Sequence, residues 1–305
     1  MTPNKSFDSS GAQFAWDSTS LSLAATCLRK YYYKMIEGWQ PFLPSVHLVF
    51  GAHYATALEH YHKHLALGDD HETALRKIVH EALCATGTRD NDGHWHVWTP
   101  LDDKKSRENL IRTIVWYCEE FRDDNLVTMK KSDGTPAVEY SFALPVDNDY
   151  VLTGHIDRLV EFSGDPYVTD NKTTGGTIAP YYFKQFDNDA QMSQYTFAGK
   201  IIFGVPVKGV IIDGAQIAVG FSRFERYMTM RTESQLTEWY DESMALIERT
   251  REHTRENFFP MNRTACGNYG GCEFRDACSR PPEIREQFLK SDFFRGKRWD
   301  PLESR

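Results

Sequence analysis

The sequence lacks the long apolar stretches of a membrane protein. No apolar run approaches the ~20 residues that a membrane-spanning helix needs. Its first residues, MTPNK, lack the apolar centre of a secretory signal peptide. We therefore expect no membrane association and a location in the cytoplasm.

The sequence also lacks an excess of positive charge, an internal repeat and a phosphate-binding G-x-x-x-x-G-K-[ST] motif. The missing motif excludes a P-loop motor, so any DNA unwinding has to come from a partner. The formal net charge is −8 and the pI is near 5.8. This balance does not favour a nucleic-acid binder, but it is compatible with one, because a local basic groove can coexist with an acidic surface.

Cysteine is scarce and unevenly placed. Six cysteines without a secretion signal point away from a disulfide framework. Cys84 and Cys118 lie within helical patterns, and we expect both to be small core residues. The other four lie near the two ends of the chain, at Cys27, Cys266, Cys272 and Cys278.

What is present indicates one α/β domain over residues 1–305, with helices first and a sheet with interleaved helices after them. We expect a helical insertion at about 65–130, a loop-like stretch at 258–278 and a polar tail at 281–305. The periodicity of apolar residues predicts helices at 18–39, 52–65, 72–83, 104–123, 189–200 and 234–257. It predicts strands at 137–146, 150–162, 167–173, 207–214 and 221–227.

The strands at 150–162 and 167–173 are separated by Ser-Gly-Asp-Pro, which predicts a hairpin. Side chains alternate along a strand, so Asp170 and Lys172 share one face and Asn171 points away. Asp157 on the neighbouring strand can join them. Paired carboxylates suit Mg²⁺, and a lysine beside them can position a water for phosphodiester hydrolysis. By itself, Asp-x-Lys on a strand is more typical of a solvated face.

Three motifs together resemble the PD-(D/E)XK nuclease superfamily. They are GHIDR at 154–158, matching G-x-x-D-R; VTDNKT at 168–173, matching D-x-K-T; and QMSQY at 191–195, matching Q-x-x-x-Y. The chain is most similar to the RecB-like and AddB-like exonuclease branch, which includes phage exonucleases and CRISPR-adaptation nucleases. The resemblance covers residues 18–278. It implies a restriction-endonuclease-like central mixed sheet flanked by helices, in a bacterium or a phage-infected host cell.

The resemblance implies one or two Mg²⁺ or Mn²⁺ ions held by Asp157, Asp170 and Glu59, with the carbonyl of Asn171 as a further ligand. The family also has a histidine four residues before the glutamate, but this chain has Ala55 there. His53 is the nearest upstream histidine and lies on a different side of the helix. We expect His60 and His62 to face solvent.

The remaining site residues also receive roles from the resemblance. Lys172 aligns the attacking water, and Gln191 and Tyr195 position the lysine or the scissile strand. These two residues share a helix face because they are four positions apart. Arg158 is consistent with a phosphate contact and equally with a buried structural ion pair.

Family members with an iron–sulfur cluster carry one cysteine near the N-terminus and three near the C-terminus. Cys27, Cys266, Cys272 and Cys278 have that distribution, so the resemblance implies a [4Fe–4S] cluster joining the two ends of the chain. A structural Zn²⁺ site and unligated thiols remain alternatives. The first C-terminal spacing, C-x5-C, is wider than the family's usual C-x2-C.

The sequence thus predicts a metal-dependent exonuclease acting on single-stranded DNA or double-stranded ends, in recombination, repair or end processing. A helicase or a recombination protein is the expected partner. The alternative is a catalytically weak nucleic-acid-binding accessory protein on the same scaffold. The presence of Asp157, Asp170 and Lys172 argues for the enzyme.

Overall fold

The computed structural model describes residues 5–92 and 94–303. The chain forms two compact units. The first is built from Met1–Pro44, Ser141–Gly154 and Thr232–Arg305, and the second from Ser45–Tyr140 and His155–Arg231. The predicted helical insertion lies within the second unit, and the prediction of a single domain stays a prediction.

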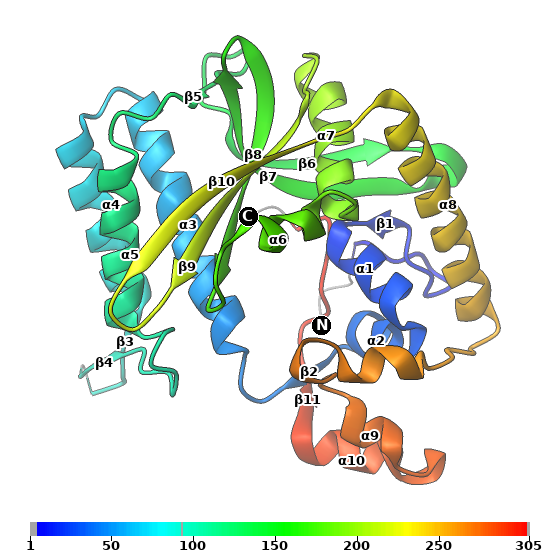
Figure 1. Ribbon diagram of the computed structural model, residues 1–305. Coiled ribbons are helices and arrows are strands. Elements are labelled where there is room, and N and C mark those ends of the chain that lie inside the picture. The colour runs from blue at the N-terminus through cyan, green and yellow to red at the C-terminus, as the bar shows by residue number, and fades with distance from the viewer. Residues whose placement is uncertain (1–4, 93, 304–305) are drawn as a thin grey trace. The chain divides into compact units, whose positions relative to one another are not determined.

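The second unit is organised around a mixed sheet (Figure 1). Its main strands follow the order β7 (Val151–Phe162, which enters this unit at His155), β8 (Asp165–Thr174), β9 (Gly209–Ile217) and β10 (Ser222–Met230). The β7–β8 and β9–β10 pairs are antiparallel, whereas β8 and β9 are parallel. The short strand β5 (Val127–Thr128) pairs antiparallel with β7. This arrangement confirms the predicted α/β class with a central mixed sheet.

The turn between β7 and β8 is tighter than the four residues predicted. It consists of Ser163 and Gly164, whose φ angles are 53° and 85°. Positive φ at both central positions is the geometry of a type I′ turn, whose twist matches that of paired strands. Asp165 and Pro166 belong to β8, where Pro166 is paired with Glu161 at the start of the strand.

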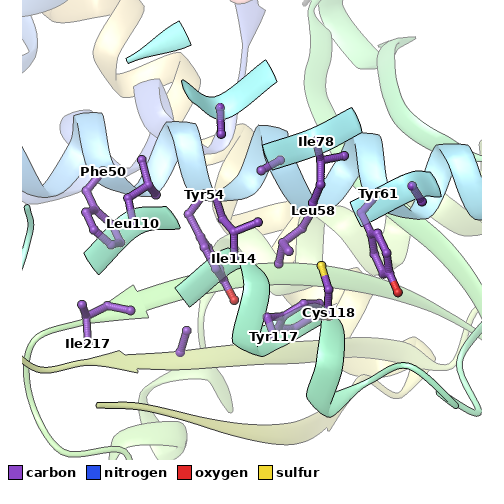
Figure 2. Packing of buried hydrophobic residues seen from close by; sticks show 14 residues of the cluster. Phe50, Tyr54, Leu58, Tyr61, Ile78, Leu110, Ile114, Tyr117, Cys118 and Ile217 are labelled. Carbon is purple, nitrogen blue, oxygen red and sulfur yellow. The ribbon is translucent and has the colours of Figure 1, made fainter. Parts of the chain in front are cut away.

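One face of this sheet is covered by helices α3 (Val46–Ala66) and α5 (Arg107–Glu120), and α4 (His71–Ala85) packs against both. Side chains at helical spacing along α3 meet apolar residues of α5 (Figure 2). The residues labelled there are Phe50, Tyr54, Leu58, Tyr61, Ile78, Leu110, Ile114, Tyr117, Cys118 and Ile217. Cys118 is buried as predicted, whereas Cys84 is exposed, so its predicted core position is wrong.

Helix α3 starts at Val46, earlier than the predicted residue 52. Gly51 therefore lies inside the helix. A Cβ at this glycine would come 3.6 Å from Thr173 Oγ1 of β8, so the helix passes close to the strand. The predicted start was wrong because a glycine was read as a helix boundary, whereas here it lies at a close helix–strand approach.

The other face of the sheet is covered by α6 (Pro180–Phe183), a 3₁₀ turn at Lys184–Phe186 and α7 (Ala190–Phe203). Helix α7 contacts β8 and β9. It begins where predicted because the side chain of Asp189 accepts hydrogen bonds from the backbone N–H groups of Gln191 and Met192. The loop predicted at 86–100 holds a small hairpin of β3 (Gly87–Arg89) and β4 (Trp95–Val97).

The first unit holds the two ends of the chain. The predicted helix at 18–39 is interrupted at Cys27, which is extended, giving α1 (Ser18–Thr26), α2 (Leu28–Tyr31) and a π-helical turn at Tyr32–Ile36. The other early elements are β1 (Ala15–Trp16), which runs parallel to the start of β7, and β2 (Trp39–Pro41). Strand β6 (Val138–Pro145) also pairs with β7, and a 3₁₀ turn at Asp147–Asp149 follows it.

The later part of the first unit is more ordered than predicted. Helix α8 (Glu233–Arg255) matches the expectation. The loop-like stretch contains a 3₁₀ segment at Arg263–Gly270 and α9 (Arg275–Ser279), and the polar tail contains a 3₁₀ turn at Pro282–Ile284, α10 (Arg285–Asp292) and β11 (Phe293–Arg295). Strand β11 pairs with β2, a long-range contact that the local sequence does not reveal. None of the described helices is long and apolar enough to cross a membrane.

Candidate active site

The candidate site lies where β7 and β8 stop pairing. Their ladder runs from Phe162–Asp165 to Arg158–Thr169, and Asp157 and Asp170 are the next residues on the two strands. Beyond that point β8 continues to pair with β9 as far as Thr174. The two aspartates are therefore opposite each other at the place where one strand separates from the other.

Asn171 takes part in this opening. Its backbone N–H donates to Asp157 Oδ2 over 3.0 Å, and its side-chain Nδ2 donates to the same oxygen over 3.2 Å. The expectation that Asn171 points away is thus wrong for its amide group. Because N–H and C=O of one strand residue point to the same side, the Asn171 carbonyl also faces the opening.

Lys172 is held between a carboxylate and an amide. Its Nζ lies 2.6 Å from Asp170 Oδ2 and donates to Gln191 Oε1 over 2.9 Å. Gln191 Nε2 in turn donates to Tyr195 Oη over 3.0 Å. The four side chains form a continuous chain from β8 to α7. The i, i+4 spacing of Gln191 and Tyr195 lets both take part.

Burial and neighbouring charges shift the pKa values of the site residues. Burial, together with the charge of Asp170, raises the pKa of Asp157 to about 6, against the opposing hydrogen bonds from Asn171. Burial also raises the pKa of Asp170, although Lys172 opposes the shift. For Lys172, burial lowers the pKa, but the carboxylates of Asp170 and Asp157 outweigh it and the net shift is upward. Lys172 is therefore an ammonium at neutral pH.

These donors fit a hard divalent cation. Two carboxyls face a single ammonium, and burial raises the pKa of both carboxyls. Within the described residues, Asp157 Oδ1 accepts no hydrogen bond, so it has a coordination position to offer. Carboxylate and carbonyl oxygens are the ligands that Mg²⁺ and Mn²⁺ prefer.

Glu59 and His53 both lie on α3 but differ in position. Glu59 is buried at 7% exposure in the same unit as the two aspartates. Among the described residues, no oxygens from Glu59, Asp157 and Asp170 all lie within 4.8 Å of one another. His53 is partly buried, its ring centroid is 6.0 Å from that of Trp98, and burial lowers its pKa. The structure groups the two aspartates but places neither α3 residue in that close set.

Arg158 points to the opposite face of the sheet from Asp157. It is buried, and its Nη1 donates to His62 Nδ1 over 2.8 Å. The expectation that His62 faces solvent is wrong, because α3 buries this side against the sheet. His60 is half-buried and meets Glu81 over 2.6 Å. The geometry favours the structural alternative for Arg158 over a phosphate contact.

The network around Arg158 contains further buried charges. Arg226 of β10 contacts Asp213 of β9 and forms two bonds to Asp124, at 2.7 and 2.9 Å. Tyr117 of α5 donates to Asp213 Oδ2 over 2.5 Å. Burial and the charges of Arg158 and Arg226 hold the pKa of His62 well below its usual range, so this imidazole is neutral.

The four cysteines of the predicted cluster all belong to the first unit. All are free and partly buried. The backbone N–H of Asn262 lies 3.3 Å from Cys27 Sγ, and Cys266 Sγ lies 3.8 Å from the Asn262 carbonyl oxygen. Burial raises the pKa of Cys278 to about 11 against the opposing charge of Arg29, and the proximity of Cys272 and Cys27 adds to the shift. No three sulfurs of the described cysteines lie within 4.8 Å of one another.

Two other groups of possible metal ligands lie outside this site. They are His71, Glu72 and Glu119, and Asp90, Asp92 and His94. Their carboxylates are exposed, and the His71 ring is already held by Tyr61 and Glu119. Neither group bears on the aspartate pair.

Sequence reasoning missed two residues that shape the site. Gly214 is the register partner of Lys172 on β9, and a Cβ there would meet the Phe183 ring at 3.1 Å. Tyr182, next to Phe183, has a pKa raised by burial and influenced by the charges of Lys172 and Asp170. A glycine inside an apolar strand marks the close approach of another group, and this was the available signal.

A hairpin that separates at two aspartates, beside a lysine held by a helix glutamine, is an arrangement suited to metal-assisted phosphodiester hydrolysis. The comparison with protein families agrees with this class: the PD-(D/E)XK nuclease superfamily matches residues 16–279. The chain therefore belongs to the PD-(D/E)XK nuclease superfamily.

Comparison with solved structures gives distant neighbours. One is a protein from Eubacterium rectale that carries the provisional description of an exonuclease, with 12% identity, 90% of this chain and 92% of that chain covered, and a TM-score of 0.49. Another is a protein from Vibrio cholerae with 11% identity, 82% and 60% coverage and a TM-score of 0.23. No curated protein sequence matches the chain.

Proposed function

We propose that this protein is a metal-dependent DNA exonuclease of the RecB-like and AddB-like branch, acting in recombination, repair or end processing. The observation that carries the proposal is the connected set Asp157, Asp170, Lys172 and Gln191 at the separation of β7 and β8. Family membership supports nuclease activity. The choice of DNA, of an exonuclease and of Mg²⁺ or Mn²⁺ is the part we propose.

In this proposal the side chains have two roles, to hold the cation and to orient the water. Asp157, Asp170 and the Asn171 carbonyl would hold the cation, with Glu59 completing the set from α3. When bound, the cation supplies a Lewis acid for the negative charge that develops on the phosphoryl oxygens. Lys172 carries its proton at neutral pH, so it orients a water or stabilises a phosphoryl oxygen and does not act as the base.

Gln191 and Tyr195 fix the lysine. Gln191 Oε1 accepts from Lys172 while its Nε2 donates to Tyr195 Oη, so the amide cannot turn over without losing both bonds. The ammonium is then directed towards Asp170 and the opening. Preorganised charge of this kind needs no rearrangement during the reaction.

Digestion of end-labelled linear DNA, single- and double-stranded, with Mg²⁺ or Mn²⁺ tests the proposal. The wild type should shorten linear strands and leave closed circles intact, and chelation should stop it. Asp170→Asn should abolish cleavage. The matched control is Asp165→Asn, because Asp165 lies at the other end of the same strand, is half-buried and pairs with Lys208. Cutting of circles would replace the exonuclease assignment with an endonuclease, and an active Asp170→Asn protein would refute the site.

We also propose a [4Fe–4S] cluster on Cys27, Cys266, Cys272 and Cys278. The cluster is supported by free, partly buried thiols that come from both ends of the chain and influence one another electrostatically. Four thiolates sharing one Zn²⁺ at about 2.3 Å would have sulfurs only about 4 Å apart. Each thiolate of an iron–sulfur cube binds its own iron, so wider sulfur spacing suits the cluster better.

Iron and sulfide analysis of anaerobically purified protein, with a visible absorption spectrum, tests this cluster. Cys266→Ser should remove the absorbance and the iron. Cys84→Ser is the matched control, since Cys84 is exposed and lies outside the set. A colourless wild type that contains one zinc per chain would establish the alternative.

A further inference from the structure

The connection between β8 and α7 is firmly anchored beside Lys172. Phe183 and Phe186 are buried, and Phe183 stacks on Tyr227 at 5.4 Å. Gly214, the register partner of Lys172, leaves the space that the Phe183 ring occupies. Partners in register on parallel strands carry side chains on the same face. Phe183 therefore lies on the face of the sheet that carries Lys172, immediately next to it.

The end of this connection is fixed as well. Arg231 is buried, and its Nη2 donates to the Phe186 carbonyl over 2.9 Å. Its Nε donates to Ser193 Oγ of α7 over 2.9 Å. The short α6 segment is thus tied to β10 and to α7, so residues on it have a defined position relative to the site.

Tyr182 presents a phenol at this place. Its ring packs edge-on against Phe183 and Phe186, with centroids 5.1 and 5.8 Å away. Within the described residues its hydroxyl has no hydrogen-bond partner, and the charges of Lys172 and Asp170 both act on it. An aromatic ring held by buried neighbours, with a hydroxyl within the electrostatic influence of the charged site residues, is placed to meet a ligand.

Tyr181, the preceding residue, is 70% exposed. It follows Pro180, whose fixed φ begins α6, so the ring is offered to solvent from a stiff backbone. No aromatic partner accompanies it among the described residues. Packing of the chain therefore accounts for Phe183 and Phe186 but not for Tyr181.

We propose that Tyr181 is a stacking platform for an unpaired nucleobase of the strand being cleaved, with the hydroxyl of the neighbouring Tyr182 on the adjacent phosphate. This inference rests on the proposed nuclease function and specifies its substrate as a single-stranded end. A base can stack on an aromatic side chain only when its face is free of the duplex, and every base offers such a face. The platform would thus select for single strands with little preference among bases.

Steady-state cleavage of single-stranded and blunt double-stranded DNA by the full-length metal-loaded protein tests this platform. Tyr181→Ala should raise KM for single strands about 5- to 100-fold, the range of one lost base–aromatic stack, with kcat little changed. Blunt ends should be affected much less. Phe221→Ala is the matched control, because Phe221 is an exposed aromatic at 50% exposure on the turn between β9 and β10. Equal effects on both substrates, or none, would overturn the platform.

A binding measurement separates failure of this inference from failure of the nuclease proposal. A single strand carrying 2-aminopurine near its end should lose fluorescence on binding Asp170→Asn protein. Adding Tyr181→Ala should restore the fluorescence, and Tyr182→Phe should retain the quenching while lowering kcat in the otherwise wild-type enzyme. Quenching without any cleavage by the wild type would sustain the platform and refute the nuclease. Cleavage without Tyr181-dependent quenching would do the reverse.

Discussion

The two faces of one sheet treat buried charge in opposite ways. Asp157 and Arg158 are neighbours on β7, yet Asp157 joins Asp170 and Lys172 on one face while Arg158 joins Asp213 and Arg226 on the other. On the face covered by α3 and α5, the cations Arg158 and Arg226 are matched by the carboxylates of Asp213 and Asp124. On the opposite face, the two carboxyls of Asp157 and Asp170 face the single ammonium of Lys172, and burial raises the pKa of both carboxyls.

This difference distinguishes a supporting network from a reacting one. In a buried set with equal numbers of positive and negative groups, mutual attraction offsets the cost of desolvation. Removing one partner leaves a buried charge without compensation. An unbalanced set is relieved by a bound cation or by protonation. We therefore expect mutations on the face that carries Arg158 to lower folding stability and mutations on the face that carries Asp157 to lower cleavage.

The largest effect should come from breaking the balanced set. Asp213→Ala removes the acceptor of Tyr117 and one of the two carboxylates that contact Arg226 and offset the buried charges of Arg158 and Arg226. We expect a loss of about 3–5 kcal/mol in the free energy of unfolding, measured by urea denaturation. Asp187→Ala, which removes the Tyr227 hydroxyl contact at the surface of the same unit, is a milder control. A stability close to wild type for Asp213→Ala would contradict the supporting role.

Lys172→Ala should have the converse effect. Cleavage should fall about 100- to 1000-fold, as for the loss of one preorganised charge, while the unfolding transition stays near that of the wild type. Lys184→Ala serves as the control, since Lys184 is an exposed lysine on the connection to α7. The measurement is single-turnover cleavage, with thermal unfolding of the same variant. A large drop in the unfolding temperature of the Lys172→Ala protein would contradict the distinction between the two faces.

The unbalanced face should also respond to pH. The pKa of Asp157 is about 6 in the folded protein against an ordinary value of 3.8, so its protonated form is favoured by folding. Metal-free stability should therefore be higher below pH 4 and decline as pH rises through about 6. The difference between wild type and Asp157→Asn isolates this group from the other carboxyls.

At limiting Mg²⁺ the same group sets the activity. Cleavage should increase with pH through about 6, because the deprotonated carboxylate is the form that binds a cation. Titration of metal-free protein against pH by calorimetric unfolding, with and without Mg²⁺, checks both trends. A pH-independent difference between wild type and Asp157→Asn would show that the carboxyl titrates normally.

The smallest effect should come from the turn that both faces share. Ser163 has a φ of 53°, a conformation that asparagine adopts more readily than serine. Ser163→Asn should add a few tenths to about 1 kcal/mol of stability without changing cleavage. Equilibrium unfolding and the DNA assay together check it. An altered cleavage rate would mean that the turn influences the separation of β7 and β8.

The side chains on the face that carries Asp170 and Lys172 could be predicted from the sequence for a local reason. Alternation along a strand places Asp170 and Lys172 together, and helical spacing places Gln191 and Tyr195 together, so short segments suffice. These placements match the geometry, while the catalytic roles remain to be measured. Sequence was also sufficient for the α/β class, because helical and strand periodicities differ over windows of a few turns.

It was uninformative where burial depends on distant segments. His62 is a polar residue whose burial the helix periodicity does not predict, because it depends on Arg158, which approaches from β7. The ordering of β11 depends on β2, and the position of Phe183 depends on the space left by Gly214. Each of these involves residues far apart in the chain, for which one sequence contains no periodic signal.

The two-residue turn at Ser163 and Gly164 also bears on the order of assembly. It brings Asn171 to Asp157 across only 14 positions, whereas Cys27 meets Asn262 across 235. Hairpins form in about 1–10 μs, while closing a long loop carries an entropy cost that grows with its length. We expect β7 and β8 to form early during refolding, well before the cysteine segments meet. A cluster would then be inserted into a chain whose reactive centre is already in place.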